Sequence, residues 1–255
     1  MSVSDLKTQV AVQIDLQKKS FFILLMVFMF FGLTSLVTQY YTNDILKLSG
    51  LEITNLPDPS FRMAFSDIWG DFLFVSVIGS FFISASLFSS EVQQGKTVYI
   101  LLNRPITRRQ YFLTRSIISL LGYFVILTVD SVIMYLIGSL IFPSIPFVDV
   151  IVASTMISLG VVGFISLQLM INSKYSGSTT TIYSLFMMIG FLAVSPFLQY
   201  FDWLKYTNPF SLTDIWSAIL FDSDYSGIWL NLLALLAWIV VPILIGMRYY
   251  EKRDL

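Results

Sequence analysis

Very few residues in this chain have side chains suited to covalent or metal chemistry. The 255 residues include no cysteine and no histidine. Thiolate nucleophiles, imidazole bases, disulfides, and zinc or haem sites built on those ligands are therefore excluded. Gly95-Lys96-Thr97 looks like the end of a phosphate-binding loop, but that motif requires a glycine five residues earlier, where this chain has Ser90. The sequence predicts no catalytic residue, no cofactor site and no metal site, so we expect a protein that is not an enzyme by itself.

Asp130 is the exception, because it is an ionisable residue inside a long apolar stretch. An ionised carboxylate at the centre of a membrane costs about 2.5–3.5 kcal/mol on insertion scales, so Asp130 should face the protein interior, protonated or partnered. Ser119 and Tyr123 fall roughly on the same helical face. Two interpretations stay open. The three residues line a translocation path in which Asp130 handles a substrate or a proton, or Asp130 forms an interhelical hydrogen bond to a hydroxyl or to Gln168.

The polar segment 89–110 has the clearest local structure signals in the chain. Gly95 permits a bend after a short helical continuation. Pro105 ends the apolar run that follows, and Thr107 with Gln110 matches the S/T-x-x-E/Q capping box that begins a helix. These signals predict a short, rigid elbow that exposes both charge and apolar area. Such a surface normally has a partner.

Composition indicates the environment in which these residues are positioned. Hydrophobic residues make up 56% of the sequence and charged residues 12%, against roughly 25% charged residues in ordinary globular proteins. A soluble fold of this size could not hide so much apolar surface from water. The formal net charge of −1 gives no argument for a nucleic-acid partner, and we expect none. The first 20 residues are too polar for a signal-peptide core, so we expect the N-terminus to be retained.

Six stretches are apolar enough, and long enough, to cross a hydrocarbon core that needs about 20 helical residues. Helices are expected because backbone groups in lipid must be satisfied within the segment. The expected spans are residues 21–38, 72–88, 116–142, 148–171, 182–198 and 228–247. In residues 1–20, Val3, Leu6, Val10 and Ile14 recur three or four apart, which predicts an amphipathic helix on the inner interface. The whole chain, 1–255, is thus predicted to be a single all-α transmembrane domain.

Two connections have signals of their own. Pro143 and Pro146 separate the third and fourth spans, which predicts a tight connection ending at Phe147. The run from Phe210 to Phe221 is apolar and too short to span, and it favours a re-entrant or interfacial helix.

The basic residues predict the orientation. With both termini in the cytoplasm, Lys47, Arg62 and Lys205 lie outside, and the other twelve of the 15 lysines and arginines lie inside or at the inner boundary. By the positive-inside rule, the topology is N-in and C-in. We expect a multi-pass protein of the cell (plasma) membrane, in contact with membrane lipids.

The run from Glu91 to Arg109 reads E-x-x-x-G-K-T-x-x-x-L-L-x-x-P-I-T-R-R. It resembles the pattern E-x-x-x-G-T-x-x-x-L-L-x-x-P-[IV]-[ST]-R of permease subunits in ABC-2 type ATP-binding-cassette transporters. The matching residues are Glu91, Gly95, Leu101, Leu102, Pro105, Thr107 and Arg108. This chain departs from the pattern by inserting Lys96 before Thr97, which shifts the spacing by one residue. Six spans, an amphipathic N-terminal helix and both ends inside agree with the resemblance.

The resemblance implies that segment 89–110 lies in a groove of a separate ATPase subunit and couples nucleotide-driven movement to the helices. The implied coupling residues are Glu91, Gly95, Lys96, Thr97, Leu101, Leu102, Pro105, Thr107, Arg108 and Arg109. The implied partners are two ATPase subunits, which would hold ATP and Mg, and a second permease copy or a homologous permease. The apolar composition favours export of a hydrophobic or amphipathic cargo such as a peptide, lipid or drug.

Other interpretations of the same residues remain. The basic residues could serve only to fix topology and to contact anionic lipid. The chain could be a proton- or ion-coupled secondary transporter that uses Asp130, although no inverted repeat is evident. It could also be a membrane anchor that transports nothing and binds a cytoplasmic partner through segment 89–110.

Overall fold

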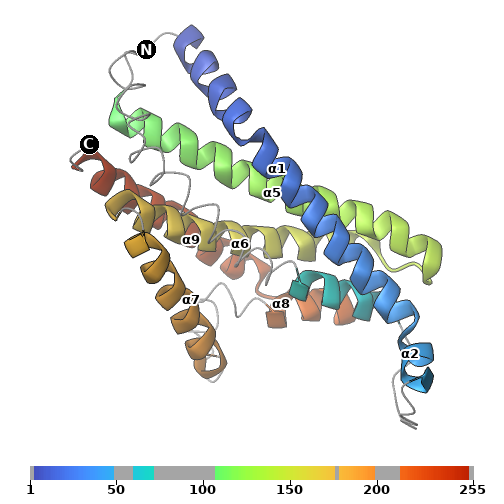
Figure 1. The fold of residues 1–255 in the computed structure, drawn as a ribbon. Helices are drawn as coiled ribbons and strands as arrows, with labels where there is room; N and C mark the ends of the chain where they lie inside the picture. The colour runs from blue at the N-terminus through green and yellow to red at the C-terminus, as the bar shows by residue number, and fades with distance from the viewer. Residues whose placement is uncertain (1–2, 49–59, 72–106, 176–177, 199–212, 253–255) are drawn as a thin grey trace.

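The computed structural model describes residues 3–48, 60–71, 107–175, 178–198 and 213–252, and within these ranges the chain forms helices and short connections without strands (Figure 1). The predicted span 72–88 and the loop residues 89–106 lie outside the described residues. The helices are α1 (Val3–Tyr40), α2 (Thr42–Leu48), α5 (Arg108–Ile141), α6 (Phe147–Lys174), α7 (Ser178–Leu198), α8 (Thr213–Ser217) with the π-helical turn η2 (Ala218–Asp222), and α9 (Ile228–Glu251). Residues 61–71 are also helical.

Four helical segments in the described part of the chain are long and apolar enough to cross a membrane. They are Gln17–Tyr40 of α1, and the whole of α5, α6 and α9. The predictions at 21–38, 116–142, 148–171 and 228–247 are therefore confirmed as candidate spans. The predicted span 182–198 falls within α7, which is helical but is not one of these four. In its described residues the chain is an all-helical membrane protein, while the count of six spans stays a prediction.

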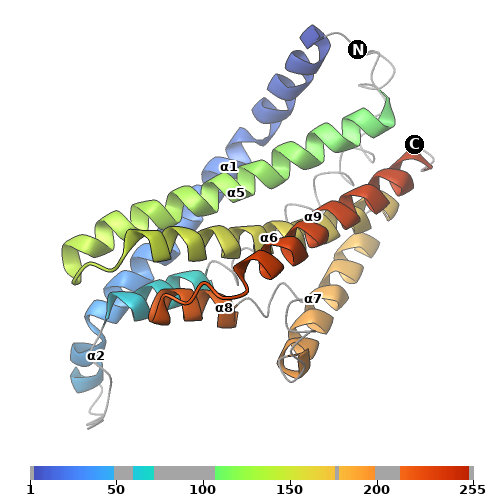
Figure 2. The ribbon, with the colours of Figure 1, turned by 180° about the vertical axis from the view of Figure 1, so that it is seen from behind.

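The residue pairs in contact show how the long helices are oriented. Gln13 with Arg115 and Gln17 with Ser119 are each 102 residues apart, so α1 and α5 run parallel. The separation is also nearly constant between α6 and α9, at 72 residues for the bond from Ser166 to Trp238 and 76 for the close approach of Gly246 to Met170. These two helices are therefore parallel as well. The short connection between α5 and α6 makes the two pairs antiparallel to each other (Figure 2).

The two ends of the bundle carry opposite charge. One end, here called the basic end, holds the first turns of α1 and α5 and the last turns of α6 and α9 (Figure 1). Described basic residues at or near it are Lys18, Lys19, Arg108, Arg109, Lys174 and Arg248. The opposite, acidic end holds Asp44, Asp67, Asp71, Asp149, Asp222 and Asp224. Both ends of the described chain thus lie on one side of the bundle, and the assignment of that side to the cytoplasm stays a prediction.

Helix α6 lies at the centre. In its most apolar window 78% of the residues are buried, against 28%, 39% and 22% for the corresponding windows of α1, α5 and α9. Helix α7 leaves the bundle at an angle in both views (Figures 1 and 2). The outward faces of α1, α5, α7 and α9 carry exposed apolar side chains such as Phe22, Leu121, Phe186 and Leu233, as a lipid-facing surface requires.

The N-terminal region differs from the expected arrangement. The sequence predicts a separate interfacial helix over 1–20, whereas α1 continues through residue 20 without a break to Tyr40. The physical reason is that Gln13 and Gln17 face α5 and are 2% and 3% exposed, while the apolar Ile14 is 49% exposed. The polar face of this segment is therefore used for packing against a neighbouring helix.

Two connections agree with their predictions. Helix α5 ends at Ile141 and α6 begins at Phe147, with Pro146 as its N-terminal cap residue. The expected helix in the apolar run Phe210–Phe221 is confirmed over the described residues 213–222, which form α8 and η2. Trp216 of α8 packs edge-on against Trp69, with ring centroids 5.1 Å apart.

Candidate functional site

The start of α5 forms the predicted capping box. Thr107 Oγ1 accepts a hydrogen bond from the Gln110 amide at 3.2 Å, and Gln110 Oε1 accepts one from the Thr107 amide at 3.2 Å. Arg108 and Arg109 follow in the first turn, where the positive end of the helix dipole makes cations unfavourable. Helix stability therefore does not explain these two arginines, which favours a role in topology or in contact with a partner.

Seven of the ten predicted coupling residues precede the part of the chain that the structure describes around α5. Glu91, Gly95, Lys96, Thr97, Leu101, Leu102 and Pro105 lie outside the described residues. Of the ten, the structure describes Thr107, Arg108 and Arg109, and it places all three at the basic end.

Arg115, about two helical turns further on, links α5 to α1. It is 3% exposed, and its Nη1 donates to Gln13 Oε1 and to Tyr111 Oη, each at 3.2 Å. Ser119 Oγ donates to Gln17 Oε1 at 3.1 Å. A buried guanidinium needs such acceptors because a charge without them is very costly inside a protein. These buried hydrogen bonds tie the start of α5 to α1.

Asp130, Ser119 and Tyr123 are all in the protein interior, as predicted, with exposures of 0%, 0% and 1%. The ring of Tyr123 packs edge-on against Phe21 at a centroid distance of 6.4 Å. Within the described structure, neither the Tyr123 hydroxyl nor either Asp130 carboxylate oxygen has a hydrogen-bond partner, and the same is true of the Ser116 hydroxyl. Since Ser116, Tyr123 and Asp130 are seven residues apart, they follow one stripe along α5.

These contacts bear on the two interpretations of Asp130, a residue of a translocation path or an interhelical hydrogen bond. The hydrogen bond to a neighbouring hydroxyl or to Gln168 is not formed. An unpartnered, ionised carboxylate in this position is costly, so Asp130 is either neutral here or meets a donor in another conformation or complex. The three predicted path residues are buried on one helix, α5, but Ser119 bonds to α1 whereas Asp130 makes no such bond.

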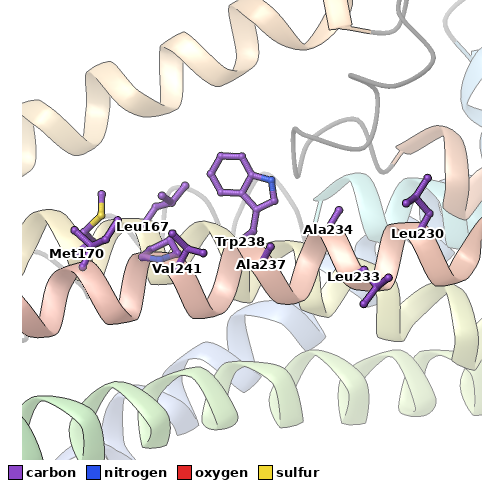
Figure 3. Close-up of a pocket in the computed structure, with 10 residues that line it drawn as sticks. Leu167, Met170, Leu230, Leu233, Ala234, Ala237, Trp238 and Val241 are labelled. Atoms are coloured by element: carbon purple, nitrogen blue, oxygen red, sulfur yellow. The ribbon is translucent and has the colours of Figure 1, made fainter.

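A groove of about 800 Å³ lies along α6 and α9 (Figure 3). Its described lining is Leu167, Met170, Leu230, Leu233, Ala234, Ala237, Trp238, Val241, Pro242 and Ile245. All ten are apolar or aromatic, and the groove lies in helices that can span a membrane. The indole of Trp238 stands out from α9 near the middle of the groove (Figure 3).

A second, polar cleft of about 550 Å³ lies at the acidic end. Its described lining is Thr34, Ser35, Thr38, Ser66, Asp67, Gly70, Asp71 and Trp216. Ser35 Oγ donates to Asp71 Oδ2 at 2.7 Å, which ties α1 to the helix at 61–71. Partial burial, and secondly the charge of Asp71, raise the pKa of the Asp67 carboxyl above its usual value of 3.8.

Asp149 fastens the first turn of α6 to the connection before α9. It is 3% exposed and accepts hydrogen bonds from Ser223 Oγ, at 2.7 Å, and from the hydroxyl of Tyr225. The bond to Asp149 raises the pKa of Tyr225 above its usual value of 10. Across the described residues, no group of three or more acidic side chains lies close enough together to hold a metal ion.

Two of these contacts had only partial signals in the sequence. Arg115 was visible as a basic residue near the inner boundary, but its bond to Gln13 depends on the pairing of α1 with α5. Asp149 falls at the start of the predicted span 148–171, but its burial depends on the path of residues 223–227.

No protein-family model matches this chain, and no curated protein matches it. The features that bear on function are therefore the motif at 91–109, the arrangement of the helices and the contacts described above.

Proposed function

We propose that this chain is the membrane-spanning permease subunit of an ABC-2 type ATP-binding-cassette transporter. The observation that carries the proposal is the run from Glu91 to Arg109, which resembles the coupling motif of that family. The capping box at Thr107 supports it, because the motif ends where a rigid helix of 34 residues begins. A push on the loop would reach that helix without being absorbed by a flexible joint.

In the proposed mechanism, two ATPase subunits bind ATP and Mg and move segment 89–110 as they close. The movement enters α5 at Arg108 and Arg109 and passes to α1 through Arg115 and Gln13, which are hydrogen-bonded at 3.2 Å. A second permease copy, or a related permease, completes the transporter. The basic end would face the cytoplasm of a cell membrane, in line with the positive-inside rule.

The cargo in this proposal is hydrophobic or amphipathic, and the transporter exports it. The support is the apolar lining of the groove along α6 and α9, which is formed by residues of two candidate membrane spans. The described lining of this groove contains no charged side chain that would recognise a charged cargo.

Isolation of the tagged chain from its native membrane, in a mild detergent, tests the proposal. We expect a separate ATPase with a phosphate-binding loop to co-purify at a ratio near one to one. A chain that transports cargo in liposomes by itself, with no ATPase retained, would contradict the proposal. An ATPase that co-purifies without any transport activity would favour the membrane-anchor function instead.

Asp130 favours a second candidate function, proton- or ion-coupled transport. The specific observation is that its carboxylate is fully buried and unpartnered. Asp130→Asn separates the two candidates, because it keeps the shape of the side chain and removes its charge. Under the ATP-driven proposal, transport by the Asn variant stays within about twofold of wild type. Complete loss of transport, with folding and ATPase binding intact, would favour the ion-coupled function or a direct contact of Asp130 with cargo.

A further inference from the structure

Helix α9 contains a proline in a position where a membrane helix needs an external hydrogen-bond donor. Pro242 lies inside α9, four residues after Trp238. In a regular α-helix the amide of residue 242 would donate to the Trp238 carbonyl, but proline has no amide hydrogen. A carbonyl left without a donor in a water-free environment is costly, and serine hydroxyls of neighbouring helices are among the groups that can satisfy it.

Ser166 of α6 supplies that donor. Its Oγ lies 2.6 Å from the Trp238 carbonyl oxygen and 2.7 Å from the Gly163 carbonyl oxygen. A serine hydroxyl has one hydrogen and therefore satisfies one acceptor fully at a time. The Gly163 carbonyl lies within the regular part of α6 and has the amide four residues later as its donor. The Trp238 carbonyl has lost its helical donor, so it is the acceptor that depends on Ser166.

Close packing on both sides of Pro242 holds the two helices at this distance. A Cβ added to Gly163 would lie 3.2 Å from Trp238 Cβ, and one added to Gly246 would lie 3.1 Å from Met170 Cα. Trp238 precedes Pro242 by about one turn and Gly246 follows it by about one turn, so both halves of α9 are fixed against α6.

We infer that Ser166 is a positioning residue that fixes the path of α9 at Pro242 by donating to the carbonyl that the proline leaves without a helical donor. Trp238 and Pro242 both line the groove, so this bond also sets the width of the groove along α6 and α9 (Figure 3). The inference concerns the geometry of α9 and does not depend on the proposed transport function.

A double-mutant cycle on the full chain in detergent tests the inference. Ser166→Ala should lower the midpoint of thermal unfolding by about 3–8 °C, because it leaves a partly buried carbonyl without this donor. In the Pro242→Ala background the new amide satisfies the same carbonyl, so Ser166→Ala should lower the midpoint by less than about 2 °C. Equal losses in the two backgrounds would overturn the inference and leave Ser166 with a packing role alone.

Ser131→Ala is the matched control. Ser131 is 1% exposed, and its Oγ donates at 2.9 Å to the Leu127 carbonyl of its own helix, where no proline removes the helical donor. Its loss should change the midpoint by less than about 2 °C. If Ser166→Ala does not accumulate as a folded protein, the Ser166→Ala/Pro242→Ala double variant should restore accumulation to the level of Pro242→Ala. Failure of that rescue would also overturn the inference.

A distance measurement separates positioning from stability. The chain has no cysteine, so nitroxide labels can be attached at cysteines introduced for Trp229 and Arg248, which are exposed on the two sides of Pro242. Ser166→Ala should broaden and shift the distribution of label-to-label distances, whereas Ser131→Ala should leave it unchanged. An unchanged distribution in a folded Ser166→Ala variant would overturn the inference.

Discussion

The two parallel helix pairs of this protein are held together by different kinds of contact. Between α1 and α5 the contacts are long side chains, as in the hydrogen bond from Arg115 to Gln13. Between α6 and α9 the main chain itself is involved, through Gly163, Gly246 and the bond from Ser166 to the Trp238 carbonyl.

The difference indicates which pair can move. Long side chains can keep a hydrogen bond while their helices shift, whereas a close contact to the main chain loses about a quarter to a half of its dispersion energy when a gap of about 0.5–1 Å opens. The side-chain pair also carries the capped start of α5 at the basic end, where we propose that the ATPase acts. We therefore expect α1 and α5 to respond to a partner and α6 and α9 to act as the fixed frame.

The largest expected effect comes from breaking the α1–α5 pair at Arg115. Arg115→Met keeps much of the apolar length of the side chain but removes the donors to Gln13 and Tyr111, and hydrogen bonds to charged groups contribute about 1.5–3 kcal/mol each. We expect a loss of about 3 kcal/mol, measured as the midpoint of thermal unfolding in detergent. Arg109→Met, at an exposed position on the same helix, is the control and should stay within about 0.5 kcal/mol of wild type. Similar midpoints for the two variants would contradict the importance of the buried guanidinium.

Glycine substitutions compare the two pairs directly. A Cβ at Gly246 would lie 3.1 Å from Met170 Cα, which belongs to the main chain, so Gly246→Ala should cost about 1–3 kcal/mol. A Cβ at Gly122 would lie 2.2 Å from the tip of the Phe21 ring, which can rotate away, so Gly122→Ala should cost less. Gly190, with nothing within 4 Å, is the control, and Gly190→Ala should gain up to about 1 kcal/mol from helix propensity. A larger loss at Gly122 than at Gly246 would reverse the assignment of the fixed pair.

Asp149→Asn tests the frame at the acidic end. The substitution weakens the bonds accepted from Ser223 and Tyr225, and we expect a loss of about 1–2 kcal/mol. Faster hydrogen exchange should be confined to the first turn of α6 and to residues 223–227. Exchange that rises equally in α1 and α5 would show that the two pairs are not independent.

The smallest expected effect concerns Asp67 in the polar cleft beside α1. Its folded-state pKa is raised, chiefly by burial and then by Asp71, so its ionised form costs stability at neutral pH. This cost is relieved as the pH falls through the raised pKa toward 3.8. Asp67→Asn should therefore stabilise the protein by a few tenths of a kcal/mol at pH 7, after allowance for solvent screening, and by nothing near pH 3.5.

The control for this pH dependence is Thr38→Val, in the lining of the same cleft, which changes no ionisable group. It should leave the pH dependence of stability unchanged. A gain for Asp67→Asn that grew toward acid would reverse the sign of the effect and contradict the partial desolvation of its ionised form.

The sequence was sufficient for the helices but not for their contacts. Apolar runs predicted the four candidate spans with limits that differ from those of the helices by up to eight residues, and the capping box correctly located the start of α5 at Arg108. The polar face of residues 1–20 was misread, because Gln13 and Gln17 suit either water or a buried donor. Whether these glutamines face water or α5 depends on how α1 pairs with α5. That pairing, in which contacting positions are 102 residues apart, is set by tertiary packing.

The contact at Pro242 also has one part that the sequence predicts and one part that only the packing of the helices decides. Its position inside an apolar stretch predicts a freed carbonyl at Trp238 by helix geometry alone. The donor could be any of several serines until the pairing of α6 with α9 selects Ser166.

Site-directed cross-linking is the most direct test of the proposal that an ATPase acts at the start of α5. Single cysteines replace Arg109, at the basic end, or Ser144, in the α5–α6 connection, in a chain that has no cysteine of its own. The proposal predicts that a cross-linker attached at position 109 captures a phosphate-loop ATPase in native membranes and that one at position 144 does not. Capture from position 144, or no capture from position 109 while the ATPase is present, would contradict it.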